Sequence, residues 1–292
     1  MPECIACSTL MAMRFGENVP CHWVCQKCGL ECIVPQPDDR ALSEIYTASY
    51  FAHYQDSEID TGVVRAMKRA TYARQLRKLR PAESGAPPRL LDCGAATGFL
   101  CELAEEMGWN AFAAEFSEFG AEACTKLLGP ERVHRGEIQG AQFAGNSDGR
   151  FEVITMFDFI EHVREPLNVL ISARERLVRG GALLIGTPRT GTISWRVMGR
   201  EWFAYSPREH LWFFSSDSMK RLLEKSGFRS VEVWALPKAV TIGYALAHYA
   251  RRTNYSPIFS PMSRFLATVL GASVKRQHFW FYLGDMCVLA RT

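Results

Sequence analysis

The chain lacks several features that mark specialised classes of protein. Its 34 basic and 31 acidic residues leave a net charge of only +3, which argues against a protein built mainly to coat nucleic acid. No apolar run reaches about 18 residues, and the start is not basic and then apolar, so we expect neither a membrane span nor a secretory signal. Internal repeats and low-complexity tracts are also absent. We therefore expect a soluble, cytoplasmic protein, and 292 residues are enough for one α/β core and a small extra module.

The ten cysteines are not expected to form disulfides, because clustered cysteines in a reducing compartment are more often metal ligands or core residues. Two Cys-x-x-Cys pairs near the N-terminus have the separation of a zinc ribbon. The four predicted ligands are Cys4, Cys7, Cys25 and Cys28. Since Cys21, His22 and Cys32 lie nearby, an exchanged ligand set stays open, as does a pair of knuckles without metal. Four thiolates leave no free coordination position, so a zinc ion there is expected to be structural.

The chain is predicted to divide into three segments. Residues 1–40 form the zinc ribbon, residues 41–86 a helical linker, and residues 87–292 the main α/β domain. Within the linker, residues 62–80 contain seven Lys or Arg and no acid, and their apolar residues recur at helical spacing. The basic face of this helix is either a solvated surface or a contact for phosphates or another anionic surface.

Residues 90–100 read as an apolar strand that runs into a glycine turn and then a helix. Such a turn leaves the first backbone N–H groups of the helix unpaired and directed outward, where they can hold a polar ligand. Gly94 and Gly98 allow a ligand to approach the backbone, and Asp92 lies at the hinge. A generic strand-to-helix turn is the plain alternative. A dinucleotide site is disfavoured because Gly94-Ala-Ala-Thr-Gly98 breaks the Gly-x-Gly-x-x-Gly spacing, whereas Glu115 after the next apolar run suits either cofactor.

A second set of apolar runs continues the α/β pattern. The first spans residues 151–163 and reads as a buried strand that ends near Phe157-Asp158, before the pair Glu161-His162. Pro166 is expected to open a helix that Gly180 closes, and another strand follows over residues 180–188.

The C-terminal part is predicted to complete the sheet. Val231–Ala235 and Met286–Ala290 read as the final strand pair, of which one strand is antiparallel. Between them we expect an insertion of about residues 237–280 with two amphipathic helices, Ala239–Arg252 and Met262–Lys275. This insertion is large enough to act as a lid, a dimer surface or a contact for an apolar substrate tail, and the sequence does not choose among these roles or indicate an oligomeric state.

The glycine turn resembles motif I of the class I S-adenosylmethionine-dependent methyltransferases, with Ala96 in place of the middle glycine. The run through the Glu161-His162 turn and residues 180–188 is similar to the same family, especially to the branch with ubiquinone-biosynthesis O-methyltransferases and sugar or natural-product enzymes. The resemblance covers about residues 87–235. It implies a Rossmann-like, seven-stranded methyltransferase sheet with helices on both faces, beside the small N-terminal zinc ribbon, and S-adenosylmethionine as the cofactor of the domain at 87–292.

The resemblance also assigns cofactor contacts. Asp92, Gly94, Ala96 and Gly98 would hold the methionine end of the cofactor, and Glu115 with Phe116 would hold the ribose and adenine. Glu137 matches a position where the family often places an acid against the adenine amine. Phe157 and Asp158 would line the methionine side.

Residues 189–214 are too aromatic for an ordinary loop. Long aromatic loops at strand ends commonly form the wall of a ligand pocket, so Trp202, Tyr205 and Trp212 are predicted to bind substrate, with a core plug as the alternative. His162 and His210 are candidate bases because histidine titrates near neutrality. Each could instead be a hydrogen-bonded structural residue.

These features together predict a methyltransferase that acts on a small molecule, such as a sugar or a secondary metabolite. Oxygen is the atom that we expect it to methylate. RNA methylation is the alternative, since some rRNA methyltransferases also carry a zinc ribbon, but the near-neutral charge disfavours a nucleic-acid partner. The third hypothesis is a non-catalytic scaffold that binds the cofactor.

Overall fold

The computed structural model describes residues 1–16, 20–38, 41, 61–79, 85–202, 204–205, 209–251, 259–275, 277–282 and 284–292. The chain folds into two compact units. The first contains residues 1–47, 79–236 and 284–292, and the second contains residues 48–78 and 237–283. The N-terminal ribbon is thus part of the larger unit, while most of the expected linker and the expected insertion share the smaller unit.

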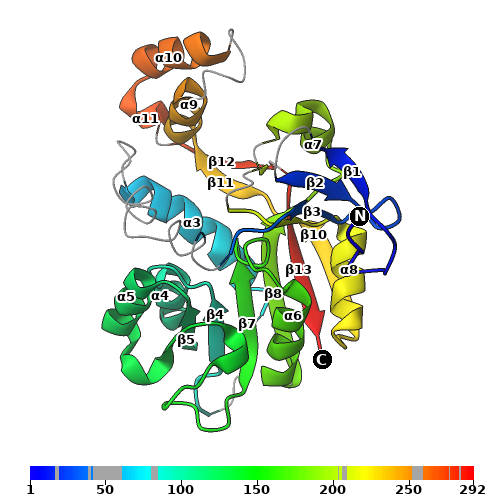
Figure 1. Cartoon of the computed structure of the whole chain (residues 1–292). Coiled ribbons are helices and arrows are strands. Elements are labelled where there is room, and N and C mark those ends of the chain that lie inside the picture. Colours follow the sequence, from blue (N-terminus) through cyan, green and yellow to red (C-terminus); the bar gives the residue numbers. More distant parts are fainter. Residues whose placement is uncertain are drawn as a thin grey trace. The chain divides into compact units, whose positions relative to one another are not determined.

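The larger unit is built on a seven-stranded sheet, which confirms the predicted α/β class (Figure 1). The strand order is β10-β13-β8-β7-β4-β5-β6, and every neighbouring pair is parallel except those made by β13. The strands are β4 (Arg89–Cys93), β5 (Asn110–Glu115), β6 (Val133–Arg135), β7 (Phe151–Phe157), β8 (Leu177–Pro188), β10 (Ser230–Ala235) and β13 (Asp285–Arg291). The final antiparallel strand pair is therefore present as predicted.

In the part of the chain that the structure describes, the helices below contact strands of this sheet. They are α4 (Phe99–Glu106), α5 (Glu118–Leu128), α6 (Pro166–Arg176) and α8 (Ser216–Lys225). The connections between parallel strands are right-handed. One series leads from β4 through β5 to β6 at one edge of the sheet, and the other leads from β7 through β8 to β10 at the opposite edge. Helices α4 and α5 therefore lie on one face of the sheet, and α6 and α8 lie on the other. Single-turn 3-10 helices, η1 (Pro130–Arg132) and η2 (Ile138–Gly140), flank β6.

Local sequence explains why these elements form where they do. The central strands β4, β5 and β7 are almost wholly buried, as a parallel sheet covered on both faces requires. Ser117 and Ser215 accept backbone hydrogen bonds as N-caps of α5 and α8, which satisfies the free N–H groups at a helix start. Helix α8 ends just before Gly227, which has a φ of 89°.

The predicted end of α6 is wrong by four residues. The helix ends at Arg176, and β8 begins at Leu177 rather than near Gly180. Leu177 already pairs with Phe151, and the register shifts before Val153 pairs with Ala182. Gly180 lies inside this irregular stretch with a φ of 78°, so it serves a turn within β8 rather than a helix end.

A separate four-stranded sheet holds the N-terminal ribbon in the larger unit. Its order is β1-β2-β3-β9, and its strands are β1 (Ala12–Phe15), β2 (Cys21–Val24), β3 (Glu31–Val34) and β9 (Trp212–Phe213). The fourth strand comes from the aromatic segment of the α/β domain. Between β8 and β9 lie α7 (Ile193–Met198) and the 3-10 helix η3 (Gly199–Glu201).

The smaller unit contains α3 (Thr61–Leu76), β11 (Lys238–Thr241), α9 (Ile242–Arg251), α10 (Phe259–Val269), α11 (Ala272–Lys275) and β12 (His278–Phe281). The predicted helix over Ala239–Arg252 is wrong at its start, because Ala239–Thr241 pairs with β12. The backbone N–H of Ala239 also donates to the hydroxyl of Thr71 in α3, over 2.9 Å. The second predicted helix is interrupted between α10 and α11. Among the residues that the structure describes, no helix has both the length and the apolar character needed to cross a bilayer.

Candidate functional site

The glycine turn connects β4 to α4 at the carboxyl edge of the sheet. Gly94, Ala96 and Gly98 have φ values of 72°, 50° and 79°, a left-handed conformation that favours glycine. No side chain among the described residues caps α4 at Gly98. The N-terminus of this helix lies at the turn, and helix N-termini attract polar and anionic groups.

Gly94 is also required by the packing beside the turn. A Cβ at this position would lie 2.4 Å from Cδ2 of Phe159, a residue that follows β7. The turn and the end of β7 are thus in close contact, and only glycine permits that approach.

Glu115, at the end of β5, fixes the turn from the other side. Its side chain is 6% exposed, with Oε2 accepting the backbone N–H of Ala96 and Oε1 accepting that of Ser117, each over 2.8 Å. Burial raises the pKa of this carboxyl even though these N–H groups oppose the rise. A carboxylate oxygen can accept more than one hydrogen bond, and this acid at the end of β5 is at the position that the resemblance assigns to the ribose hydroxyls.

Asp92 occupies the strand that precedes the turn. Its side chain is 4% exposed, and its Oδ1 accepts the hydroxyl of Thr155 in β7 over 2.7 Å. Burial, together with the charge of Glu115, raises the pKa of Asp92 to about 7. Two buried, like-charged carboxyls are unfavourable alone and are relieved by a cation, which fits the positively charged sulfur and amino group of S-adenosylmethionine.

The other predicted cofactor residues gather at the same edge. Phe116 follows β5 and is 50% exposed, while Glu137 is exposed after β6. Phe157 ends β7 and is 8% exposed. Asp158 is exposed with a φ of 48°, and its N–H donates to the carbonyl of Gly186 in β8. Their direct contacts with a cofactor stay a prediction.

The two predicted bases lie against each other. The rings of His162 and His210 meet edge to face with centroids 4.6 Å apart. Nδ1 of His162 lies 2.9 Å from the carbonyl of Glu209, and Nδ1 of His210 lies 2.7 Å from the carbonyl of Ala204. A carbonyl only accepts hydrogen bonds, so in the neutral form each Nδ1 carries the proton and each Nε2 has the free electron pair. Burial and the neighbouring His210 lower the pKa of His162 to about 3.

Glu161 completes this cluster. It is 1% exposed, and its Oε2 accepts the hydroxyl of Thr187 in β8 over 3.0 Å. One ligand atom each from Glu161, His162 and His210 lies within 4.8 Å of the others. Two imidazoles and a carboxylate are ligands that suit divalent transition metals, so this group could hold either a metal ion or an acceptor hydroxyl.

The aromatic segment packs against the ribbon. Trp202 and Trp212 are 1% and 7% exposed, and the ring of Tyr205 lies 5.1 Å from that of Trp202 and 4.8 Å from that of His22. These positions give all three predicted substrate residues a place in the core beside the ribbon. A substrate contact for any of them stays a prediction.

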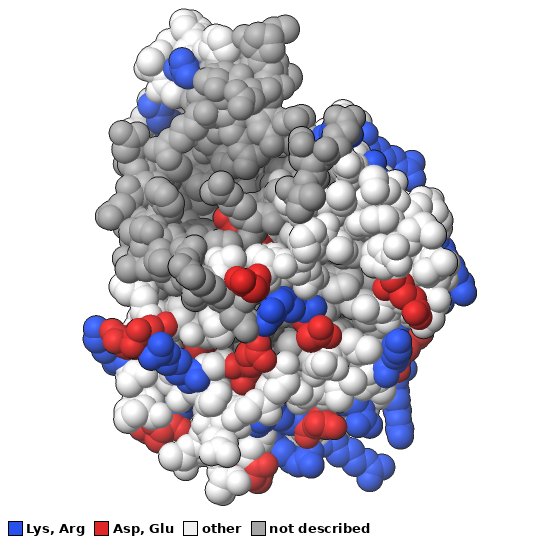
Figure 2. Space-filling view, viewed as in Figure 1, with Lys and Arg blue, Asp and Glu red and all other residues white. Residues whose placement is uncertain are grey.

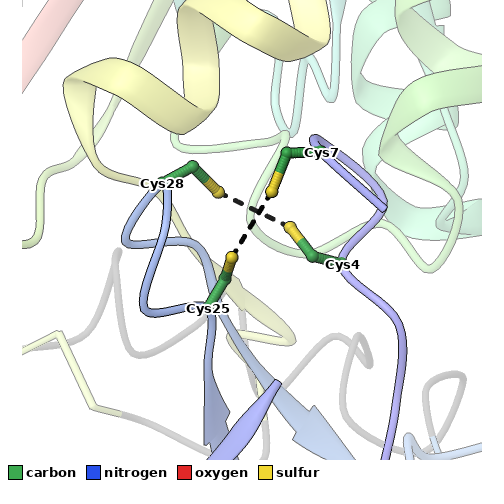
Figure 3. A group of neighbouring side chains, drawn as sticks. All are labelled: Cys4, Cys7, Cys25 and Cys28. Carbon is green, nitrogen blue, oxygen red and sulfur yellow. Dashed lines mark hydrogen bonds between the residues drawn. The ribbon is translucent and has the colours of Figure 1, made fainter. Parts of the chain in front are cut away.

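The structure brings the four predicted ligand cysteines together (Figure 3). The sulfurs of Cys4 and Cys28 are 3.5 Å apart, and those of Cys7 and Cys25 are 3.4 Å apart. All four point toward one centre, as a tetrahedral Zn–S₄ site requires. Burial raises the pKa of Cys4 to about 11, a cost that a bound divalent cation reverses because it favours thiolates.

Three buried polar residues of the larger unit were not anticipated from the sequence. Thr155 and Thr187 donate hydrogen bonds to the carboxylates of Asp92 and Glu161. Each interrupts an apolar run at the carboxyl end of its strand, which is the signal that could have identified it. Glu31, in β3, is 0% exposed, and its partner Tyr205 is 174 residues away in the chain. No local pattern indicates that pairing.

Charge is not concentrated on the described part of the face drawn in Figure 2, where acidic and basic side chains are interspersed. The two units nevertheless differ in sequence. Residues 48–78 and 237–283 contain twelve Lys or Arg and three Asp or Glu, so the smaller unit has a net charge of +9 and the larger unit a net charge of −6.

Comparison with protein families gives a match to a family described as "Methyltransferase domain", over residues 64–233. A curated relative, a ubiquinone biosynthesis O-methyltransferase from Cereibacter sphaeroides, is 28% identical over 159 residues, which is 49% of this chain and 61% of that protein. The mitochondrial enzyme of the same name from Schizosaccharomyces pombe is 26% identical over 102 residues, 34% of this chain and 37% of that protein. The match thus spans about three fifths or less of these relatives.

Solved structures share the fold. A methyltransferase from Thermotoga maritima described as a possible histamine N-methyltransferase has a TM-score of 0.52 at 16% identity, covering 86% of this chain and 98% of its own. Magnesium protoporphyrin IX methyltransferase from Synechocystis, solved with bound S-adenosylhomocysteine, has a TM-score of 0.53 at 12% identity, covering 87% and 99%.

Proposed function

Because the chain belongs to the class I S-adenosylmethionine-dependent methyltransferases, we propose that it methylates a hydroxyl oxygen of a small molecule. The observation that supports this proposal best is the pair of imidazoles, His162 and His210, placed after β7 and before β9. Both rings direct Nδ1 to a backbone carbonyl. Each therefore offers a basic Nε2 in its neutral form.

When bound, S-adenosylmethionine supplies a methyl group on a positively charged sulfur, so the protein need not activate the donor further. The turn at Gly94 to Gly98 and the N-terminus of α4 would hold the polar methionine end. Glu115 would accept the ribose hydroxyls, and the buried carboxyl of Asp92 would favour the positive charge. These contacts orient the donor, and orientation alone can supply several kcal/mol of the barrier.

The acceptor side requires a base, because a protonated hydroxyl is a poor nucleophile. We assign that role to the Nε2 of His162 or His210, which would take the hydroxyl proton as the oxygen displaces S-adenosylhomocysteine from the methyl carbon. The depressed pKa of His162 keeps its imidazole neutral at pH 7 but also makes it a weak base, so His210 is the stronger candidate of the two for proton removal. Thr187 and Glu161 would hold the turn in place.

The four ribbon cysteines would hold a structural zinc ion. Four thiolates leave no coordination position for substrate, so the ion would stabilise the ribbon rather than take part in chemistry. A ribbon that uses paired cysteines as metal ligands suits a reducing compartment such as the cytoplasm.

The acceptor class is proposed from the relatives. The curated proteins in the match carry the name ubiquinone biosynthesis O-methyltransferase, which supports oxygen as the methylated atom. A sugar or a secondary metabolite with a free hydroxyl is the acceptor class that we propose.

Turnover measurements test the proposal. Calorimetry should detect binding of S-adenosylhomocysteine, and a panel of hydroxylated metabolites should yield a product heavier by one methyl group. His162→Ala or His210→Ala should lower kcat by about 10² to 10⁴-fold and leave cofactor affinity nearly unchanged. Retained cofactor binding without turnover on any acceptor would instead support a scaffold.

RNA methylation is the second candidate, since the smaller unit is rich in Lys and Arg. Binding to an RNA duplex should then weaken steeply as salt concentration rises. A flat salt dependence, or turnover on small hydroxylated compounds alone, would leave the small-molecule proposal in place.

A further inference from the structure

Glu31 carries a negative charge into the interior of the larger unit. It lies at the start of β3 in the ribbon and is 0% exposed. Burial of a carboxylate is costly unless it is paired and hydrogen-bonded. The partners of Glu31 therefore indicate which part of the structure the buried carboxylate stabilises.

The side-chain partners of Glu31 lead to the aromatic segment. Arg14 in β1 lies 2.6 Å from Oε1, and the hydroxyl of Tyr205 donates to Oε2 over 2.6 Å. The same hydroxyl accepts Nε1–H of Trp195 in α7 over 2.7 Å, and the guanidinium of Arg14 lies 4.0 Å from the Trp195 ring. The carboxylate of Glu31 thus connects β1, α7 and the segment that contains Tyr205 through charge-assisted or neutral hydrogen bonds.

The backbone makes a second connection between the ribbon and the histidine pair. β3 pairs with β9, and the N–H of Ile33 donates to the carbonyl of Leu211 over 3.1 Å. On its other side, the N–H of Leu211 donates to the carbonyl of Glu161 over 2.8 Å. Leu211 therefore lies between the ribbon and the turn that carries His162.

β9 contains only Trp212 and Phe213, so it is too short to hold its own position. The segment that contains it also orients both imidazoles, because Nδ1 of His162 and of His210 face the carbonyls of Glu209 and Ala204. A shift of this segment would move both Nε2 atoms.

We propose that Glu31 is a positioning residue for methyl transfer: its buried carboxylate fixes Tyr205 and β9 so that His162 and His210 face the acceptor. The inference rests on the proposed function. It makes the ribbon a part of the acceptor side of the site, through a residue that is not among the cysteine ligands.

Two conservative variants test the proposal in the full-length, zinc-loaded protein. Glu31→Gln keeps the volume and removes the charge, and Tyr205→Phe keeps the ring and removes the hydroxyl. Glu3→Gln is the matched control, since Glu3 is an exposed acid of the same ribbon. Zinc content and the affinity for S-adenosylhomocysteine should be unchanged in all three, because the cofactor turn lies on other elements.

The decisive readouts are the imidazole NMR signals and the separation of kcat from KM. The signals of His162 and His210, assigned with the alanine variants, should shift in Glu31→Gln and Tyr205→Phe but not in Glu3→Gln. The first two variants should lose about tenfold or more in kcat, with KM for the donor unchanged, since displacement of a reacting group by about 1 Å can cost 10²-fold.

Unchanged imidazole signals and unchanged kcat in a folded Glu31→Gln or Tyr205→Phe protein would overturn the inference. Should Glu31→Gln fail to fold, Tyr205→Phe alone decides. If the wild type transfers no methyl group to any acceptor, the proposed function fails, while the imidazole signals still decide whether Glu31 positions the histidines.

Discussion

The carboxylate of Glu115 accepts the backbone N–H of Ala96 over 2.8 Å, which joins the end of β5 to the turn after β4. Ala96 stands where the resembling family has a glycine, and it has a φ of 50°. A left-handed alanine costs about 1 kcal/mol, so a hydrogen bond to a buried carboxylate at this residue helps to stabilise the turn.

Glu115→Gln should weaken the binding of S-adenosylhomocysteine by at least about tenfold. The amide can still accept one backbone N–H, but it lacks the charge that strengthens bonds to N–H groups and ribose hydroxyls. A hydrogen bond to a charged group contributes about 1.5–3 kcal/mol, against about 0.5–1.5 kcal/mol for a neutral one. Calorimetry measures the affinity. Glu118→Gln is the control, because Glu118 is an exposed acid at the start of α5 and forms an ion pair with Arg135. Equal affinity in the Glu115 and Glu118 variants would contradict the assigned role.

Cys4→Ser should remove the zinc ion and lower the melting temperature of the protein. Zinc prefers thiolates, and a structural site supplies folding free energy directly. Metal analysis after gel filtration should give about one zinc per wild-type chain and much less for the variant. Cys21→Ser is the matched control, since Cys21 is a ribbon cysteine outside the four-sulfur cluster. Loss of zinc from Cys21→Ser with retention in Cys4→Ser would show an exchanged ligand set.

Much of this architecture could be predicted from the sequence because its signals are local. The cysteine spacing and the glycine turn each lie within a few residues, and the buried strands appear as apolar runs. The sequence pattern places Gly180 at a helix end, whereas Gly180 lies within β8, because a shift in register between β7 and β8 depends on pairing with Phe151, far away in the chain.

Long-range contacts decide the rest of the site. The sequence marks residues 189–214 as aromatic, but it does not show that two of them form a strand beside β3. The same limit applies to Ala239–Thr241, whose pattern suits a helix until β12 provides a partner strand. Pairing between distant strands therefore fixed the features that composition and periodicity left open.

Stability should depend on pH through His162. Its pKa is about 3 in the folded protein and about 6.5 when unfolded, so below pH 6.5 the unfolded state binds a proton that the folded state does not. The contribution of His162 is therefore complete above pH 6.5 and falls as the pH is lowered toward 3. Asp92, whose folded pKa is raised to about 7, has the opposite slope over pH 4 to 7.

Denaturant unfolding at pH 7.5 and pH 5 measures this difference. His162→Gln should lose less stability between the two pH values than the wild type, whereas Asp92→Asn should lose more, because the favourable slope of Asp92 on acidification is removed. An identical pH dependence in wild type and His162→Gln would contradict a buried, neutral imidazole.

Gly94→Ala should damage the cofactor turn more than its backbone conformation alone explains. Two costs combine at this position: a left-handed alanine, about 1 kcal/mol, and a Cβ that would lie 2.4 Å from the ring of Phe159. Gly108→Ala isolates the first cost, since Gly108 has a φ of 88° and no atom within 4 Å of the added Cβ. We expect both variants to lose about 1 kcal/mol of stability from backbone strain, but only Gly94→Ala to lose affinity for S-adenosylhomocysteine. Because relief of the clash requires Phe159 or the turn to move, equal affinity in the two variants would mean that the cofactor does not depend on the contact between this turn and the end of β7.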